Sequence, residues 1–108
     1  MIKKEYNGYY IQIGKNQTEN DILIRSSNPE DYWVHAHGYP SGHAIISNPL
    51  NKRVPLKIIK RACFLIRSNS HTLKRIHPLK FDYTRRINVQ PTHIVGKVLV
   101  SKYSVVSM

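Results

Sequence analysis

Alternation of apolar and polar residues dominates the first half of the chain. Residues 9–13 are aromatic and β-branched and lie between Asn7-Gly8 and Gly14, which predicts a strand. The other strands predicted in this half cover residues 32–37 and 43–47, on either side of a Gly- and Pro-containing turn. Asn20 is predicted to cap a short N-terminal helical turn over residues 21–25, which Asn28-Pro29 ends.

One longer segment has helical periodicity. Pro55 suits a first helical position, and the spacing predicts a helix over residues 55–67. Its predicted core stripe consists of Leu56, Ile59, Ala62, Cys63 and Ile66. The opposite face carries Lys57, Lys60, Arg61, Phe64 and Arg67, which makes the helix apolar on one side and basic on the other.

The C-terminal third returns to short alternating segments. Residues 80–84 predict a strand with Arg85 and Arg86 at its exit, and Gln90-Pro91 predicts a break. Residues 97–100 and 103–106 predict two strands paired as a hairpin. The expected fold is therefore α+β, a mostly antiparallel sheet packed against one principal helix, in a single domain over residues 1–108.

The charge is concentrated in one stretch of the chain. The formal net charge is +11, and eleven of the seventeen Lys and Arg residues lie between 52 and 86, where Asp82 is the only acid. Such a segment attracts phosphate polyanions. An ordinary solvated basic face is the structural alternative. The candidate phosphate contacts are Lys57, Lys60, Arg61, Arg67, Lys74, Arg75, Arg85 and Arg86.

Several classes of protein are disfavoured. A lone cysteine, Cys63, excludes an intrachain disulfide and is typical of a buried thiol. No apolar run is long enough to cross a membrane, and the N-terminal residues lack the apolar segment of a signal peptide. We expect a cytoplasmic protein without a membrane partner or a cofactor.

The densest group of chemically versatile side chains lies between residues 31 and 43. Strand alternation places Trp33, His35 and His37 on one face. These histidines and His43 permit three readings: a three-histidine metal site, a small nuclease or phosphoesterase using His35 and His43 as acid and base, or a binding platform on which Trp33 stacks against bases. A buried, purely structural Trp33 is the plainer alternative for that side chain.

Residues Asp31, Trp33, His35, Pro40 and His43 together resemble the signature of the NFACT RNA-binding (NFACT-R) domain family. Other parts of the chain follow that family's order: Gly14-Lys15-Asn16, the helix after Pro55, Tyr83-Thr84 with basic residues after it, and the segment from Gly96 to Val98. The family's Pro-Gly-Ser-His turn is Pro40-Ser41-Gly42-His43 here, and its Lys- and Gly-rich loop is replaced by Arg85-Arg86-Ile87-Asn88.

The resemblance implies a stand-alone, non-catalytic domain whose partner is RNA. Large members of the family act on the ribosome in quality control and recruit tRNA, so rRNA, tRNA and the ribosome become expected partners. A DNA-binding or protein-interaction adaptor is the alternative. The expected contacts around the central turn are Lys15, Asn16, Trp33, His35, His37, Ser41 and His43. Because histidine titrates near pH 6.5, we expect cationic His35 and His43 to strengthen phosphate binding as the pH falls.

Overall fold

The structure is a computed structural model that describes residues 1–108, and it confirms the α+β class. The helices are α1 (Gln17–Ser26) and α2 (Leu56–Ser68), with short 3-10 turns η1 (Leu73–Arg75) and η2 (Arg86–Asn88). The strands are β1 (Ile2–Tyr6), β2 (Tyr9–Ile13), β3 (Tyr32–Ala36), β4 (Ala44–Ile46), β5 (Lys80–Arg85), β6 (Val89–Pro91), β7 (Val98–Val100) and β8 (Ser104–Ser107). Neither helix is long and apolar enough to cross a membrane.

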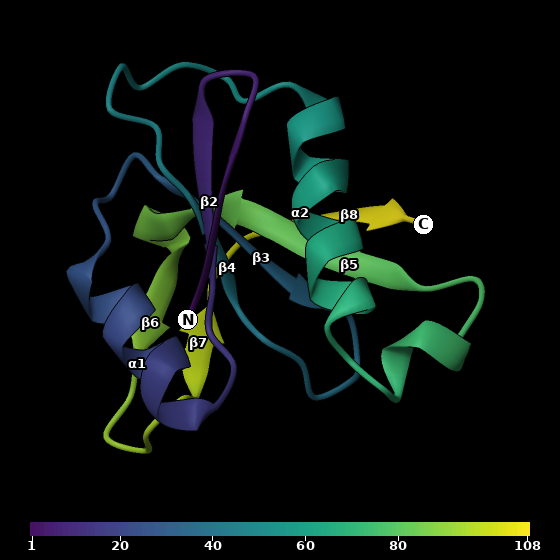
Figure 1. Ribbon diagram of the computed structural model, residues 1–108. Helices are drawn as coiled ribbons and strands as arrows, with labels where there is room; N and C mark the ends of the chain where they lie inside the picture. The colour runs from purple at the N-terminus through teal and green to yellow at the C-terminus, as the bar shows by residue number, and fades with distance from the viewer.

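A six-stranded sheet in the order β1-β2-β4-β3-β5-β8 forms the centre of the molecule, and every pairing in it is antiparallel. Helix α2 covers one face, while α1 and the two-stranded β6–β7 ribbon lie on the opposite side (Figure 1). The alternation predicted for β3 is confirmed. Val34 packs in the larger core under α2, whereas Trp33 packs in the smaller core with Leu23 and Ile24 of α1.

Helix α2 matches its predicted range, but its buried stripe is wider than expected. The residues it buries are Ile58, Ile59, Ala62, Cys63, Leu65 and Ile66. Leu56, placed in the predicted stripe, lies at the edge of this arc and is 47 % exposed, so that prediction is wrong. Burial raises the pKa of the Cys63 thiol to about 12, which fits a structural and unreactive cysteine.

The N-terminal helix begins earlier than predicted. Asn16, and not Asn20, is the N-cap: its Oδ1 accepts a hydrogen bond from the Glu19 backbone N–H at 2.9 Å. The Glu19 carboxylate in turn accepts the Lys15 N–H at 2.9 Å, which together with the N-terminal amine lowers the pKa of Glu19. Asn16 and Glu19 have the three-residue spacing of a capping box, but the Glu19 carboxylate bonds to the N–H of Lys15, one residue before the N-cap.

Two pairings at the ends of the chain differ from expectation. Strand β1 was not predicted; it pairs with β2 through Asn7 and Gly8, whose φ angles of 51° and 84° suit a two-residue hairpin turn. The hairpin expected between residues 97–100 and 103–106 does not form, because β7 pairs with β6 and β8 pairs with β5. The break expected at Gln90-Pro91 is instead part of β6, where Pro91 occupies the last position of a short strand.

Candidate functional site

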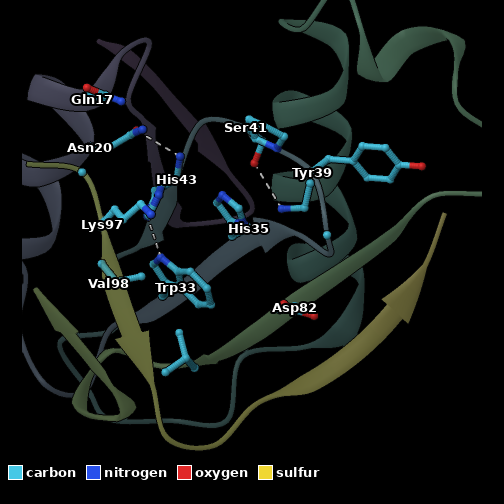
Figure 2. A pocket seen from close by; sticks show the side chains of 15 residues that line it. Gln17, Asn20, Trp33, His35, Tyr39, Ser41, His43, Asp82, Lys97 and Val98 are labelled. Atoms are coloured by element: carbon cyan, nitrogen blue, oxygen red, sulfur yellow. Dashed lines mark hydrogen bonds between the residues drawn. The ribbon is translucent and has the colours of Figure 1, made fainter. Parts of the chain in front are cut away.

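A pocket of about 590 Å³ opens on the face of the sheet opposite α2 (Figure 2). Its wall is built by α1, by the ends of β3 and β5, by the β3–β4 turn and by the β6–β7 ribbon. We call it the histidine pocket; it is lined by Gln17, Asn20, Trp33, His35, Ala36, Gly38, Tyr39, Pro40, Ser41, His43, Asp82, Gly96, Lys97, Val98 and Val100. The sequence prediction that His35, Ser41 and His43 lie together is consistent with this arrangement.

His43 is buried and held at two points. The Trp33 indole Nε1–H donates to His43 Nδ1 at 3.0 Å, and the His43 backbone N–H donates to Asn20 Oδ1 at 3.0 Å. Gly14 permits the second contact, since a Cβ at that position would lie 2.2 Å from Asn20 Oδ1. The Gly14 N–H also donates to the His43 carbonyl at 3.1 Å, so that the turn before α1 fixes the turn before β4.

The aromatic rings of the pocket pack on one another. His35 lies parallel to Trp33 at an interplanar angle of 2° and a centroid distance of 5.7 Å, and it meets His43 edge-on at 4.6 Å. Burial lowers the pKa of His35, and burial together with the neighbouring His35 lowers the pKa of His43 to about 3. Both rings are therefore neutral at physiological pH.

Two expectations about this group are wrong. Trp33 is only 2 % exposed, so it is a core residue and offers no open face on which a base could stack. The histidines also do not become cationic near pH 6.5, because the fold keeps water from solvating the charged form. Any binding in the pocket must use neutral imidazoles.

The remaining residues predicted around the turn are distributed over different sites. His37 lies outside the pocket, exposed, with Nδ1 at 2.7 Å from Asp82 Oδ1. Asn16 caps α1, and Lys15 lines a neighbouring cleft with Ser41, Gly42 and the end of α2. Because His37 is turned away, the three-histidine site is not assembled, and no group of three or more His, Cys, Asp or Glu side chains is placed to hold a metal ion.

The exposed side of α2 is the second candidate surface. Lys57, Lys60 and Arg61 lie there in the open beside Phe64, which is 48 % exposed. The Arg61 guanidinium carbon is 4.6 Å from the Tyr6 ring centroid and 5.3 Å from that of Phe64. We call Lys57, Lys60, Arg61 and Phe64 the cationic helix face; none of its side chains is in an ion pair.

The other cations that were predicted to contact RNA are either exposed or hydrogen-bonded within the protein. Lys74 and Arg75 are exposed on η1. Arg67 donates to the carbonyls of Ile76 and Met108, and Arg85 donates to Asn51 and to the Lys52 carbonyl. Arg86 donates to the Ile24 carbonyl, the Ser27 hydroxyl and the Val89 carbonyl at 2.7–3.0 Å, and burial lowers its pKa. Arg86 therefore holds α1, β5 and β6 together.

Three pocket or surface features escaped sequence reasoning. Asn20 was interpreted as a cap, whereas from α1 it accepts the backbone N–H of His43. Lys97, at the pocket rim, lies outside the basic segment of the sequence and gave no local signal. Arg53 and Lys102 line a third cleft with Arg85, and only the contact between distant strands brings them together.

The signature residue Asp31 stabilises the fold and does not line the histidine pocket. It is buried, and its carboxylate accepts the backbone N–H groups of Asn28 and Asn48 at 2.9 Å and 2.8 Å. Asp31 thus fastens the turn before β3 to the loop before α2. The signature therefore combines one fastening residue with the rings of the histidine pocket, and a known family model matches the chain around them.

That model is described as the NFACT protein RNA binding domain, and it matches residues 1–102. The chain belongs to this family. Membership supports a non-catalytic, RNA-binding role. The fold agrees: the C-terminal part of the fibronectin/fibrinogen-binding protein from Streptococcus suis superposes with a TM-score of 0.79 at 20 % identity, over 92 % of this chain and 40 % of that one.

Curated relatives have the same domain in longer chains. Coiled-coil domain-containing protein 25 from Bos taurus is 26 % identical over 89 residues, which are 80 % of this chain and 43 % of the relative. Its homolog from Dictyostelium discoideum is 27 % identical over 95 residues, 85 % of this chain and 45 % of the relative. The chain thus spans less than half the length of these relatives.

Proposed function

We propose that this NFACT-R protein binds RNA without cleaving it, and that the cationic helix face supplies the phosphate contacts. The observation that carries the proposal is that Lys57, Lys60 and Arg61 are exposed and unpaired on one side of α2. Lysine and arginine side chains that neutralise phosphates release the counterions condensed on the nucleic acid, and this release is the main source of affinity. Phe64 in their midst offers an aromatic face to an unpaired base.

A binding role fits the histidine pocket better than hydrolysis does. Acid–base cleavage of RNA requires one protonated and one neutral group near neutral pH. His35 and His43 are both held neutral by burial, and the one nearby carboxylate, Asp82, is paired with His37. Neither histidine therefore supplies the protonated acid that this chemistry needs near neutral pH.

Ribosomal RNA or tRNA in the cytoplasm is the partner we propose within the class of RNA. The reason is the resemblance to larger family members that act on the ribosome. Both RNAs present closely spaced phosphates beside unpaired loop bases, which suit a helix face that combines three cations with one aromatic ring. Duplex DNA of the same charge lacks the unpaired bases.

The test is the salt dependence of binding to a labelled tRNA, measured by fluorescence anisotropy. Contacts to about 4–6 phosphates predict that the logarithm of the affinity falls against that of salt concentration with a slope of roughly −3 to −4. Replacing Lys57, Lys60 and Arg61 together by Glu should make the slope shallower by about 2 and weaken binding at low salt by about 100-fold.

The matched control changes the net charge equally at exposed cations elsewhere, Lys3, Lys4 and Lys80. We expect the control to retain most of the affinity, and circular dichroism should show both variants folded. Equal losses in the two variants, or tighter binding to duplex DNA than to tRNA, would contradict the proposal. Release of shortened RNA during the titration would contradict its non-catalytic part.

A further inference from the structure

The histidine pocket contains hydrogen-bond donors that the fold leaves unused. An indole N–H can only donate, so the 3.0 Å contact from Trp33 Nε1 makes His43 Nδ1 an acceptor. The proton of the neutral ring must then be on Nε2. His43 Nε2 has no hydrogen-bond partner in the protein, and no unpartnered polar side-chain atom is sealed from solvent. His43 therefore presents a fixed N–H to the pocket.

The neighbouring polar groups add further donors beside His43. Asn20 Oδ1 is used by the His43 backbone N–H, which leaves the Asn20 amide N–H groups for the pocket. Asp82 accepts from His37, and the Ser41 hydroxyl is bonded to the Ala36 N–H and the Gly42 carbonyl. The rim contributes the Lys97 ammonium. A ligand that faces the His43, Asn20 and Lys97 donors must therefore bring acceptors to them.

The pocket walls favour a flat and uncharged ligand. Val98, Val100 and Ala36 are apolar, and the half-buried ring of His35, which lies parallel to the buried Trp33, adds a planar surface (Figure 2). A volume of about 590 Å³ lies within the range of roughly 300–1,000 Å³ typical of small-ligand sites and can hold one nucleoside. With both histidines neutral, Lys97 is the one cation among the lining residues, so the pocket is poorly suited to a phosphate.

We infer that the histidine pocket binds a keto nucleobase, uracil or guanine, whose carbonyl oxygen accepts the His43 Nε2–H. Trp33 is the positioning residue that fixes this tautomer. The inference rests on the proposed RNA-binding function. Keto bases present carbonyl acceptors on their edges, whereas adenine and cytosine present an amino donor at the equivalent place. That donor would face the His43 N–H and lose a hydrogen bond.

The route from the cationic helix face to this pocket follows the β3–β4 turn. Ser41 lines both the histidine pocket and the cleft that contains Lys15 and the α2 end residues Asn69 and Ser70. Ser41 thus joins the cleft to the pocket at the β3–β4 turn, and a single strand lying in the cleft has to pass around that turn to enter the pocket. Lys15 is exposed on that path and is available to a phosphate.

Short oligouridylate and oligoadenylate of equal length and charge test the base preference by anisotropy. We expect oligouridylate to bind about fivefold more tightly, the worth of one neutral hydrogen bond. Trp33→Phe keeps an aromatic ring but removes the N–H that fixes His43; the preference should fall below about twofold while the salt slope is unchanged. His43→Gln keeps an N–H near the Nε2 position and should retain part of the preference.

Nitrogen-15 NMR of the wild-type protein tests the tautomer even if Trp33→Phe folds poorly. His43 should show a protonated Nε2 and a bare Nδ1 from about pH 8 to about pH 5, and in Trp33→Phe the two tautomers should mix. Titration with uridine should shift the Trp33 indole resonance; adenosine and inorganic phosphate should not. A proton on Nδ1, or equal shifts with adenosine or with phosphate, would overturn the inference.

The two proposals fail in distinguishable ways. If uridine shifts the Trp33 signal but tRNA binds without salt dependence, the cationic helix face is wrong and the pocket stands. If tRNA binds with the expected slope while uridine, adenosine and phosphate leave the Trp33 signal unchanged, the pocket inference is wrong and RNA binding stands.

Discussion

The histidine pocket and the cationic helix face differ in how far the fold itself uses their polar groups. On α2, Lys57, Lys60 and Arg61 make no ion pair and point into solvent. Around the pocket, by contrast, the Trp33 side chain is hydrogen-bonded to His43. The turns on each side are joined by a backbone hydrogen bond and by a hydrogen bond to the Asn20 side-chain amide. The helix face can supply long-range attraction, whereas the pocket can supply only short-range, directed contacts.

This difference also separates residues that look alike in the sequence. Arg61 and Arg86 were both predicted to contact RNA, yet only Arg61 is exposed with its guanidinium over aromatic rings. Arg86 is half-buried and donates three hydrogen bonds within the protein. A charged group that is already satisfied inside the fold contributes to stability and leaves phosphate binding to its neighbours.

The Arg86→Lys variant tests whether Arg86 stabilises the fold and does not bind RNA. A lysine ammonium cannot span the Ile24, Ser27 and Val89 acceptors, so we expect a loss of about 2–3 kcal/mol in the free energy of unfolding. Urea denaturation measures this loss, and tRNA affinity per folded molecule should be unchanged. Arg75→Lys, at an exposed position, is the matched control and should alter neither quantity. Weaker tRNA binding by a fully stable Arg86→Lys would reverse the assignment.

The fold could be predicted where its signals are local. The alternation around Trp33 gives the correct faces of β3, and the periodicity after Pro55 gives α2, whereas the hairpin signal of Asn7-Gly8 was not used and β1 was missed. The partners of β7 and β8 could not be predicted, because their pairing depends on contacts with β6 and β5 rather than on a nearby turn.

The site was less accessible to sequence reasoning than the fold. Residue types alone identified His35, His43 and the basic side of α2. They could not show that Arg86 bonds to a carbonyl 62 positions away, or that burial holds both histidines neutral. Whether a polar side chain is free or engaged depends on tertiary contacts, and in this protein that property decides its role.

The neutral state of His43 in the histidine pocket should also be visible in the pH dependence of the free energy of unfolding. Unfolded His43 takes up a proton near pH 6.5, but in the folded protein its pKa is about 3. Between these values the unfolded state binds more protons, so stability decreases as the pH falls through this window. From about pH 7.5 to about pH 5 we expect a loss of about 2 kcal/mol, measured by urea denaturation.

His43→Gln should flatten that profile, and the remaining slope should reflect His35, whose pKa is also lowered by burial. His71 is exposed on the loop after α2, so His71→Gln is the control that should keep the wild-type profile. A wild-type protein that is equally stable at both pH values would show that His43 is protonated in the folded state. The histidine pocket would then be charged, like the cationic helix face.

The smallest expected effect concerns Asn16, which was predicted to contact RNA and which the fold uses as the cap of α1. Asn16→Ala removes the acceptor for the Glu19 N–H and should cost about 1 kcal/mol in thermal or urea unfolding. Asn16→Asp keeps an acceptor at the N-cap and should be close to wild type, although it changes the charge beside Lys15. If Asn16 instead contacted phosphates, the order would reverse: the aspartate would repel RNA and bind least, while the alanine variant would lose affinity without losing stability. Asn20 lies one turn further along α1, where Gly14 packs against it. Fraying of the helix start in Asn16→Ala should therefore reduce the response of the Trp33 signal to uridine only slightly.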